Sequence, residues 1–329
     1  MQVSGLVSII TPCYNSGACI HRLLDSILMQ DYPSIEMFAI DDGSTDNTKE
    51  VITSYISKFE GKGYSLTYIY QENAGQAAAV NRGMKLVKGE FLAWPDSDDY
   101  YNRTDAISTF VCTLNSLDDN YGVVCFVGTF VEETTLAPIN RNKIYNSQEQ
   151  LFETCLLGGD FLAVPINYMV RMTDFDKVNP LREIYTGQHV QNMQMLLPLF
   201  YSYKCKTIQQ SLCNILERSS SYSRISLPYE KKKEEISAWL DIKLNTLLRI
   251  KELPAADRLQ YEKRCVTIDL LSKLELAFLY MNKKDADTSL RALKKNGEPV
   301  SFKVRIKAML LHFPFIYNLS KRSKHCFHH

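Results

Sequence analysis

The sequence predicts an α/β protein in which a doubly wound sheet is followed by a smaller helical region. Over residues 7–100, short apolar runs alternate with segments whose apolar residues recur at helical spacing, a rhythm typical of a parallel sheet with crossover helices. Two of the apolar runs end in acidic turns, at 41–46 and 96–99, where open α/β sheets bind ligands. After residue 225 the pattern becomes one of amphipathic helices. We therefore expect a sheet domain over 1–225 and a helical region over 226–329.

Each element of the first hundred residues has a local signal of its own. Residues 7–12 are apolar and β-branched and stop at a proline, which predicts a buried strand. Gly43 allows a tight turn after the strand 35–40, and we expect Asp41 to form the turn and Asp46 or Asn47 to cap the helix that follows. In chain order we predict strand 7–12, helix 20–28, strand 35–40, a helix ending near Phe59, strand 66–70, helix 77–87 and strand 89–94.

The patterns after residue 100 are weaker. Residues 122–131 are mostly apolar and predict strand, whereas 132–147 is polar and loop-like. We further predict a helix over 147–157, a strand-like piece over 161–170, an apolar helix through 193–200, and amphipathic helices over 229–251, 254–282 and 285–297.

The turn at 96–99 is the most informative segment because it places three carboxylates within four residues. Asp96, Asp98 and Asp99 repel one another unless a cation lies among them, and hard oxygen ligands on a short loop suit Mg²⁺ or Mn²⁺. Such an ion would keep some waters and take its other ligands from a substrate phosphate. The alternative is a solvated acidic turn or a helix cap, as many Asp-Ser-Asp strings are.

Six motifs in a fixed order carry a family resemblance. They are Thr11-Pro12-Cys13-Tyr14-Asn15, Asp41-Asp42-Gly43-Ser44-Thr45-Asp46, Asn73-Ala74-Gly75, Asn81-Arg82-Gly83, Gly89-Glu90-Phe91 and Asp96-Ser97-Asp98-Asp99. Together they resemble the nucleotide-sugar half of family 2 glycosyltransferases, which are inverting enzymes with the GT-A fold. The match is close over 7–100 and continues more loosely to about 225, and neither a Gly-x-Gly-x-x-Gly fingerprint nor a Walker loop is present. The resemblance implies a GT-A-type doubly wound mixed sheet with a C-terminal helical appendage.

The resemblance also implies a nucleotide site. Thr11, Pro12 and Tyr14 would line the base pocket, with the tyrosine ring available for stacking. Asp42 would accept a hydrogen bond from the edge of the base. The remaining candidate contacts to the nucleotide are Asn73, Gly75, Arg82 and Asp96.

A metal site is implied on the acidic turn. Asp96 would contact the ribose or the metal, and Asp98 would ligate the Mn²⁺ or Mg²⁺ ion that bridges the diphosphate. One departure concerns the helix over 77–87, where many relatives have a basic residue at the position that Val80 occupies here. Arg82 is the neighbouring source of positive charge.

The base that activates the acceptor is left open by the sequence. Relatives often carry a Gly-Glu-Asp type motif whose carboxylate deprotonates the acceptor hydroxyl, but the matching string here is Gly187-Gln188-His189, and glutamine cannot act as a base. Three residues compete for the role: His189, which titrates near neutrality, Glu183 just upstream, and Asp160 after a Gly-Gly pair. Each also has an ordinary explanation, as a histidine at a helix start, an exposed glutamate and an aspartate at a helix end.

These observations predict a metal-dependent inverting glycosyltransferase. It would move a sugar from a nucleoside diphosphate donor, most simply UDP-linked, to a hydroxyl of a growing surface or lipid-linked glycan. One alternative is a catalytically silent sugar- or nucleotide-binding scaffold, which the missing acid pair at 188–189 would suit. The other is a sugar nucleotidyltransferase, whose Gly-rich, Arg-containing N-terminal loop is absent here.

Composition limits the partners and the compartment. A chain of 329 residues with 45% hydrophobic content can fill a sizeable core, and a net charge of +1 does not predict a nucleic-acid partner. The nine cysteines are scattered without a Cys-x-x-Cys pair, which fits the reducing cytoplasm. We expect no signal peptide, because the first strand begins within a few residues of Met1, and no membrane span, because no run of eighteen apolar residues occurs.

The segment 302–324 interleaves lysines and arginines with large apolar residues. This pattern suits a helix that lies on an anionic membrane surface, which would make the protein peripheral to the inner face of the membrane. The alternative is a helix packed on the catalytic domain. The helical region is also a candidate for contact between copies in a homo-oligomer.

Overall fold

The chain divides into two compact units. The sheet unit comprises Met1–Ile225 and Leu248–Lys251, and the helical unit comprises Ser226–Leu247 and Glu252–His329. The computed structural model describes residues 2–139, 149–159, 164–187, 191–217, 227–297 and 302–311.

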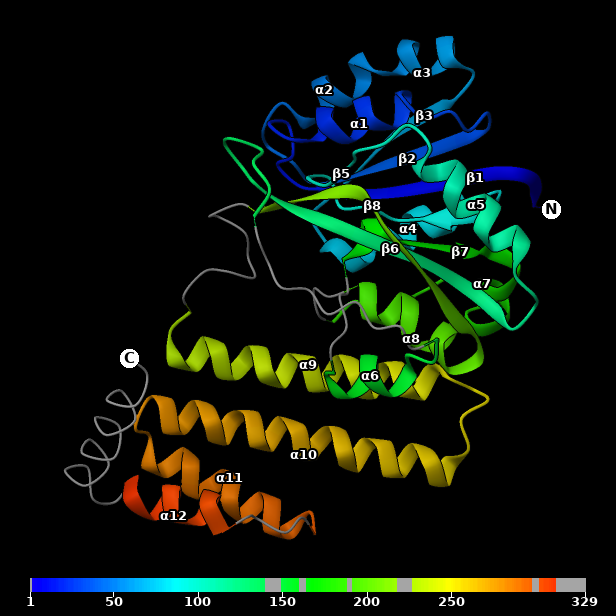
Figure 1. Cartoon of the computed structure of the whole chain (residues 1–329). Helices are drawn as coiled ribbons and strands as arrows, with labels where there is room; N and C mark the ends of the chain where they lie inside the picture. Colours follow the sequence, from blue (N-terminus) through cyan, green and yellow to red (C-terminus); the bar gives the residue numbers. More distant parts are fainter. Residues whose placement is uncertain are drawn as a thin grey trace. The chain divides into compact units, whose positions relative to one another are not determined.

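One mixed sheet of eight strands forms the centre of the described part of the sheet unit (Figure 1). The strands, in their order across the sheet, are β3 (Ser65–Gln71), β2 (Ile35–Asp42), β1 (Val3–Cys13), β4 (Gly89–Ala93), β7 (Tyr168–Arg171), β6 (Tyr121–Glu132), β8 (Lys204–Glu217) and β5 (Tyr100–Tyr101). The four strands β3-β2-β1-β4 run parallel, β7 runs antiparallel to both of its neighbours, and β6 pairs with β8 in parallel. This arrangement confirms the predicted doubly wound mixed sheet.

The register of the parallel strands brings their carboxyl ends to one edge of the sheet. Cys13 of β1 pairs with Asp41 of β2, which in turn pairs with Tyr70 of β3. On the other side of β1, Ile9 pairs with Ala93 at the end of β4. The turns that follow β1, β2 and β4 therefore emerge as neighbours, and the two acidic turns are among them.

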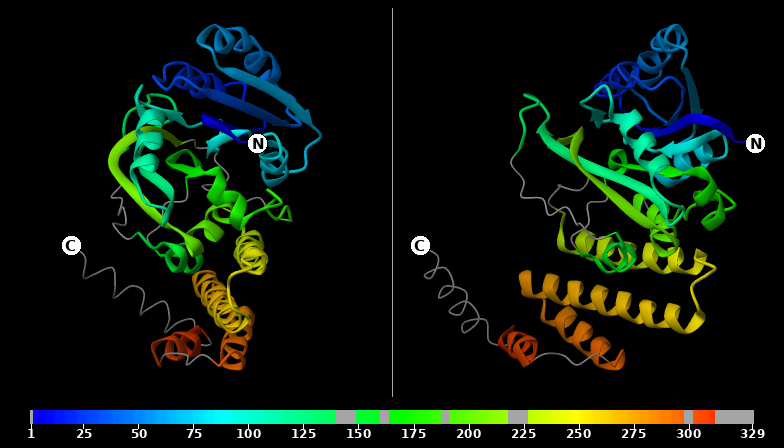
Figure 2. Two further views of the ribbon diagram at one scale, coloured as in Figure 1. Left: turned by 90° about the vertical axis from the view of Figure 1, so that its right-hand side faces the viewer. Right: turned by 45° about the vertical axis from the view of Figure 1, so that its right-hand side comes forward.

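Helices cover both faces of the sheet (Figures 1 and 2). One face carries α1 (Ile20–Leu28), α2 (Thr48–Ser54), α3 (Ile56–Lys62) and α5 (Ala106–Ser116), and the other carries α4 (Gln76–Met84), α7 (Met172–Val178) and α8 (Asn192–Ser202), with α6 (Phe152–Leu157) beside α8. Successive side chains of β1 point to opposite faces of the sheet, so each face needs its own cover of helices. Val7 and Ile9 join the core under α1, while Ile10 lies against Gly83 of α4.

Four elements of the sheet unit have too little local signal to be predicted. They are β5, α5, α7 and β8. β8 contains many polar residues, yet it pairs with β6 along most of its length and with β5 on its other edge, so pairing rather than local pattern defines it. The helix predicted to end near Phe59 is divided at Tyr55 into α2 and α3, and the piece predicted over 161–170 contains a short 3₁₀ turn, Pro165–Asn167, before β7.

The helical unit consists of long helices around a small apolar core. It contains most of α9 (Tyr229–Arg249), together with α10 (Ala255–Leu279), α11 (Lys283–Lys295) and α12 (Phe302–Leu311). The core residues are Leu274, Ala277, Phe278, Ala286, Leu293 and Leu311. The Asn282 side chain caps α11 by accepting a hydrogen bond from the N–H of Asp285.

α12 is partly buried within the helical unit. Leu311 is fully buried and Val304 packs against the same core, whereas Phe302 is 77% exposed and Ile306 is 39% exposed. Packing against α10 and α11 therefore accounts for the buried residues, and membrane contact through the segment stays a prediction. None of the helices in the described ranges is long and apolar enough to cross a membrane.

Gly83→Ala should destabilise the protein, because an added Cβ would lie 2.5 Å from Cγ2 of Ile10. Overpacking of a core costs roughly 1–3 kcal/mol. The matched control is Gly61→Ala in α3, where an added Cβ meets no atom within 4 Å and better helix propensity should add about 0.5–1 kcal/mol. Chemical denaturation measures both free energies of unfolding. Equal stability of the two variants would contradict the close packing of α4 on β1.

Candidate functional site

Hydrogen bonds join the turns that follow β1, β2 and β4. The N–H of Ser16 donates to Oγ1 of Thr48 at 2.8 Å, and the N–H of Gly17 donates to Oδ2 of Asp46 at 3.0 Å. The hydroxyls of Ser16 and Ser97 lie 2.7 Å apart and are buried. The three turns therefore form one connected surface at the carboxyl edge of the parallel strands.

Asp41 and Asp46 have the structural roles that the sequence predicts. Oδ1 of Asp41 accepts from the N–H of Ser44 at 2.8 Å and closes the turn, while Oδ1 of Asp46 accepts from the N–H of Thr48 at 3.0 Å and caps α2. Partial burial raises the pKa of Asp46, but hydrogen bonds from Thr48 and Gly17 lower it more, so the net shift is downward.

Asp42 holds the turn that leads into α4. Its side chain is 4% exposed and accepts hydrogen bonds from Nε2 of Gln71 at 2.7 Å and from the N–H groups of Ala74 at 2.9 Å and Gly75 at 2.8 Å. Gly75 precedes α4 with a φ of 89°, a conformation that favours glycine. A carboxylate offers roughly four acceptor positions, so these bonds leave little capacity for a base. Recognition of the base by Asp42 stays a prediction.

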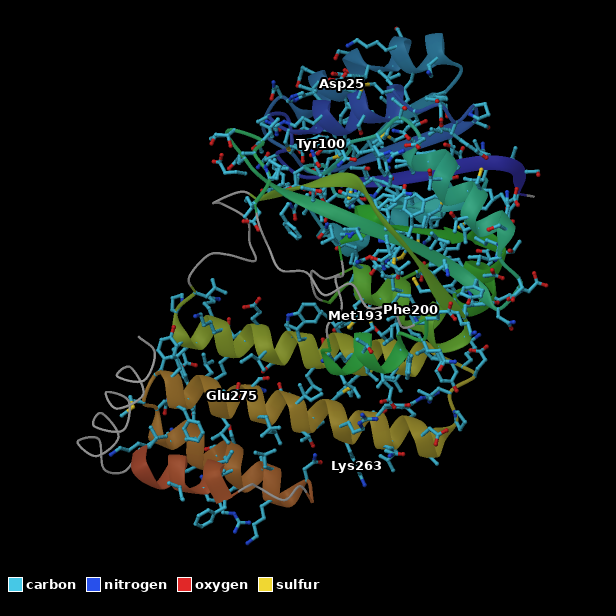
Figure 3. All side chains as sticks on the ribbon, viewed as in Figure 1. Asp25, Tyr100, Met193, Phe200, Lys263 and Glu275 are labelled. Atoms are coloured by element: carbon cyan, nitrogen blue, oxygen red, sulfur yellow. The ribbon has the colours of Figure 1, made fainter. Side chains whose placement is uncertain are left out.

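Asp96 is held between the starts of two helices. Its Oδ1 accepts from Nε2 of Gln76, the first residue of α4, at 2.7 Å, and from Nε2 of Gln191, just before α8, at 3.2 Å. Beside this contact, Oδ1 of Asn192 accepts from the indole N–H of Trp94 at 2.8 Å. Figure 3 labels two further residues of α8, Met193 and Phe200. The two glutamine amides orient the Asp96 carboxylate and disperse part of its charge.

Asp98 and Asp99 differ in their surroundings. Asp99 is 4% exposed, and its Oδ1 accepts from the N–H of Leu216 at 2.9 Å, which ties the acidic turn to β8. Asp98 is half-buried. No group of three His, Cys, Asp or Glu side chains suited to a metal occurs among the described residues. Asp96 and Asp98 nevertheless fit Mg²⁺ or Mn²⁺ in kind, because such ions are usually held by one or two carboxylates plus substrate phosphates.

The residues predicted to line a base pocket differ in exposure. Tyr14 is 56% exposed, whereas Thr11 and Pro12 are buried in β1, and within the described ranges Oγ1 of Thr11 has no hydrogen-bond partner. Asn73 lies in an exposed turn close to Gly43, where an added Cβ would lie 2.8 Å from the Asn73 nitrogen. The turns after β2 and β3 are therefore packed closely, with only Tyr14 and Asn73 of this set exposed.

Arg82 and Glu183 interact with other parts of the chain. Nη1 of Arg82 donates to the carbonyl of Tyr70 at 2.9 Å. Oε1 of Glu183 lies 2.7 Å from Nζ of Lys85, and this ion pair lowers the pKa of Glu183. Lys85 follows Gln76 by nine residues, a rise of about 13.5 Å along a helix. Glu183 thus pairs with a residue at the opposite end of α4 from Gln76, and its role as the base stays a prediction.

The other two base candidates, His189 and Asp160, lie outside the described residues, as does Gln188. Gln191, two residues after His189 in the sequence, contacts Asp96. The identity of the base stays a prediction.

Three glutamines of the site were missed from the sequence. Gln71, Gln76 and Gln191 each donate an amide N–H to a carboxylate of the site. Gln76 directly follows the Asn73-Ala74-Gly75 motif, and that position could have identified it. Gln191 is 95 residues from Asp96, and no local pattern reveals such a contact.

A mixed sheet whose parallel strands end in acidic turns defines a GT-A domain. More particularly, the chain belongs to glycosyl transferase family 2, whose family model matches residues 8–178. The matched range includes β1 from Ser8 onward, β2, β3, β4 and both acidic turns. The predicted family is therefore confirmed.

Two relatives illustrate the similarity in sequence. An uncharacterized glycosyltransferase of Rickettsia typhi is 38% identical over 125 residues, which are 38% of this chain and 36% of the relative. Glycosyltransferase GlyA of Streptococcus pneumoniae is 27% identical over 210 residues, which are 64% of this chain and 26% of the relative. The chain thus spans about a quarter to a third of the length of these relatives.

Two solved structures share the fold. Staphylococcus aureus TarS 1–349 in complex with UDP-GlcNAc has a TM-score of 0.56 at 14% identity, over 90% of this chain and 93% of that chain. A mannosyltransferase from Pyrobaculum calidifontis in complex with GDP-Man and Mn²⁺ has a TM-score of 0.55 at 16% identity, over 95% of this chain and 80% of that chain. At such identities the likeness shows the fold alone.

Asp42→Ala should weaken nucleotide binding while the protein remains folded. Its three hydrogen-bond donors would lose their acceptor, which should also lower the free energy of unfolding by about 1–3 kcal/mol. Gln71→Ala is the control, because it removes one donor and keeps the carboxylate. Calorimetry with UDP measures both variants. If Asp42→Ala bound UDP as well as the parent protein, Asp42 would be a turn residue only.

Proposed function

We propose that the protein is a metal-dependent inverting glycosyltransferase that moves a sugar from a nucleoside diphosphate donor to a hydroxyl of a growing glycan. The observation that carries this proposal is that Asp42, at the end of β2, and Asp96 and Asp98, in the turn after β4, lie at the same carboxyl edge of the parallel strands. Ligands bind at this edge in open α/β sheets. The reaction class is that of the named relatives, which are glycosyltransferases.

The donor is proposed to be a UDP-sugar. Tyr14 is exposed beside the turns after β1 and β2 and can stack on a base. Asp42 already accepts three hydrogen bonds, so at most about one of its acceptor positions is left for the N–H of a uracil edge. Support also comes from the neighbours in fold, of which one holds UDP-GlcNAc and another holds GDP-Man. Uracil and guanine both present an N–H at their edge, so a comparison of the binding affinities of UDP and GDP identifies the nucleobase of the donor.

Asp98 and Asp96 are the residues proposed to hold Mn²⁺ or Mg²⁺. When bound, the ion would neutralise the negative charge that develops on the leaving diphosphate. Gln76 and Gln191 keep the Asp96 carboxylate oriented toward one place, so that little reorganisation is needed when the donor arrives. The P. calidifontis neighbour, which is described with Mn²⁺, supports the choice of ion.

His189 is our preferred general base. Inversion needs a base within hydrogen-bond reach of the attacking hydroxyl, and a neutral imidazole has a suitable pKa. The support is indirect: Gln191, two residues further along the chain, contacts Asp96, whereas Glu183 pairs with Lys85. Asp160 is retained as the second candidate.

We further propose that the protein acts in the cytoplasm on a polysaccharide or lipid-linked glycan. The cysteines of the described chain are free thiols, as is usual in a reducing compartment. The exposed residues Phe302, Arg305 and Ile306 of α12 are compatible with peripheral membrane contact.

Binding of UDP should strengthen with Mn²⁺ or Mg²⁺, and Asp98→Asn should remove most of this gain. We expect a loss of more than about tenfold, because even outer-shell partners of a metal contribute 10–100-fold. Asp119→Asn, at an exposed carboxylate outside the acidic turn, is the control. Calorimetry of the parent protein with Mn²⁺ and with a chelator is the measurement. Equal UDP affinity under both conditions would refute metal dependence.

His189→Ala should lower the rate of transfer by about 10²–10⁴-fold, which is the usual contribution of a general base. UDP affinity should be unchanged, because the base acts on the acceptor. Glu183→Gln should transfer at nearly the parental rate, since Glu183 is paired with Lys85. Single-turnover assays of these variants and of Asp160→Asn rank the three candidates. Near-parental transfer by His189→Ala would move the role to another residue.

A further inference from the structure

A cavity of about 170 Å³ lies between α9 and α10 in the helical unit. Figure 1 shows these two helices side by side, and Figure 3 shows their side chains, with Lys263 and Glu275 of α10 labelled. The residues of the lining on which the inference depends are Trp239, Leu240 and Lys243 of α9 and Ile268, Asp269 and Ser272 of α10.

Asp269 is an unusual residue for the wall of such a cavity. It is 6% exposed, and its Oδ2 pairs with Nζ of Lys273 at 2.9 Å. Its Oδ1 is buried, and no group in the described part of the chain donates a hydrogen bond to it. Leaving an oxygen of a buried charged group unsatisfied is unfavourable, so a ligand in the cavity that donates an O–H or N–H would be stabilised once the Asp269 side chain turns Oδ1 toward it.

The size of the cavity restricts the ligand to one ring. An apolar cavity of about 150 Å³ accepts a benzene molecule, whereas drug-sized ligands need pockets of roughly 300 Å³ or more. A volume of about 170 Å³ therefore suits a single six-membered ring.

The lining restricts the chemistry of that ring. Trp239, Leu240 and Ile268 offer an apolar surface, while Asp269 accepts hydrogen bonds and the hydroxyl of Ser272 both donates and accepts. A cationic ring is disfavoured, because Lys243 also lines the cavity and Lys273 already neutralises Asp269. A pyranose combines an apolar ring face with several hydroxyl donors and carries no charge.

We propose that the α9–α10 cavity binds one sugar residue of the acceptor glycan, with a sugar hydroxyl donating to Asp269 and the ring face against Trp239. The choice of a glycan rests on the proposed function. The site itself belongs to the helical unit and is distinct from the donor site at the carboxyl edge of the sheet.

Intrinsic fluorescence tests the proposal, because the chain has two tryptophans, Trp94 and Trp239, and Trp94 is fully buried in the sheet unit. Free glucose, galactose and N-acetylglucosamine are titrated into the full chain without nucleotide. We expect at least one of them to change the emission, and we expect Trp239→Phe to abolish the change.

Variants of the cavity give the specific readout. Asp269→Asn should weaken the apparent affinity at least about tenfold, because a hydrogen bond to a charged acceptor is lost. Ser272→Leu should abolish binding by filling the cavity while Asp269 is kept. Glu275→Gln, at an exposed position of α10, should match the parent protein. Circular dichroism of each variant confirms that it is folded.

Three outcomes would overturn the inference: no sugar changes the emission, the change persists in both Asp269→Asn and Ser272→Leu, or tetramethylammonium binds better than every sugar. Release of UDP from UDP-sugars is measured separately. Transfer without any effect of sugars on Trp239 would reject this inference alone. An effect of sugars on Trp239 in a protein that transfers no sugar would reject the proposed function alone.

Discussion

Crowding of carboxylates at one edge of the sheet is the constraint on which the site depends. Asp41, Asp42, Asp46, Asp96 and Asp99 lie at the end of β2 and in the turns after β2 and β4, where their negative charges repel one another. Each of these carboxylates accepts at least one hydrogen bond from an N–H or O–H group of another segment. The bonds that offset the repulsion therefore also fix the turns relative to one another. The same hydrogen bonds that offset the repulsion thus shape the anionic surface expected to hold a nucleotide and a metal.

Asp96 connects the two halves of the proposed reaction. Gln76 reaches it from the start of α4, beside the turn held by Asp42, and Gln191 reaches it from the start of α8. The segment expected to contain the base His189 immediately precedes Gln191 in the sequence. Oδ1 of Asp96 thus accepts hydrogen bonds from Gln76, on the proposed donor side, and from Gln191, next to the proposed acceptor side. A shift of Asp96 would therefore alter its contacts with both Gln76 and Gln191. The two neutral glutamines thus have the role of positioning a charged residue.

The sequence predicts best those features whose cause is local. β1, β2 and the acidic turns follow from β-branched runs that end at proline or at consecutive aspartates, and α9–α11 follow from helical periodicity. β8 could not be predicted, because its polar residues become a strand only through pairing with β6 and β5. The pattern of residues 7–12 predicts a buried strand, and Thr11 and Pro12 are indeed buried, whereas the family motif assigns both to the base pocket. The Gln191–Asp96 contact joins residues 95 apart, and the pairing of Glu183 with Lys85 has no local signal in the sequence.

The proposed donor site lies within the residues that the family model matches, and the residues proposed for the acceptor, apart from Asp160, lie after them. The match covers residues 8–178 and includes every turn of the proposed donor site, whereas α8, β8 and the helical unit lie beyond it. Features that a family model captures are those its members share, so they cannot distinguish one acceptor from another. On the proposals above, selection of the acceptor is expected to depend on residues after 178, which include His189 and the residues of the α9–α10 cavity. If the proposed acceptor site is correct, Asp269, a buried charge with one unsatisfied oxygen in an otherwise ordinary helix pair, contributes to the choice of acceptor, which the acidic turns of the donor site do not.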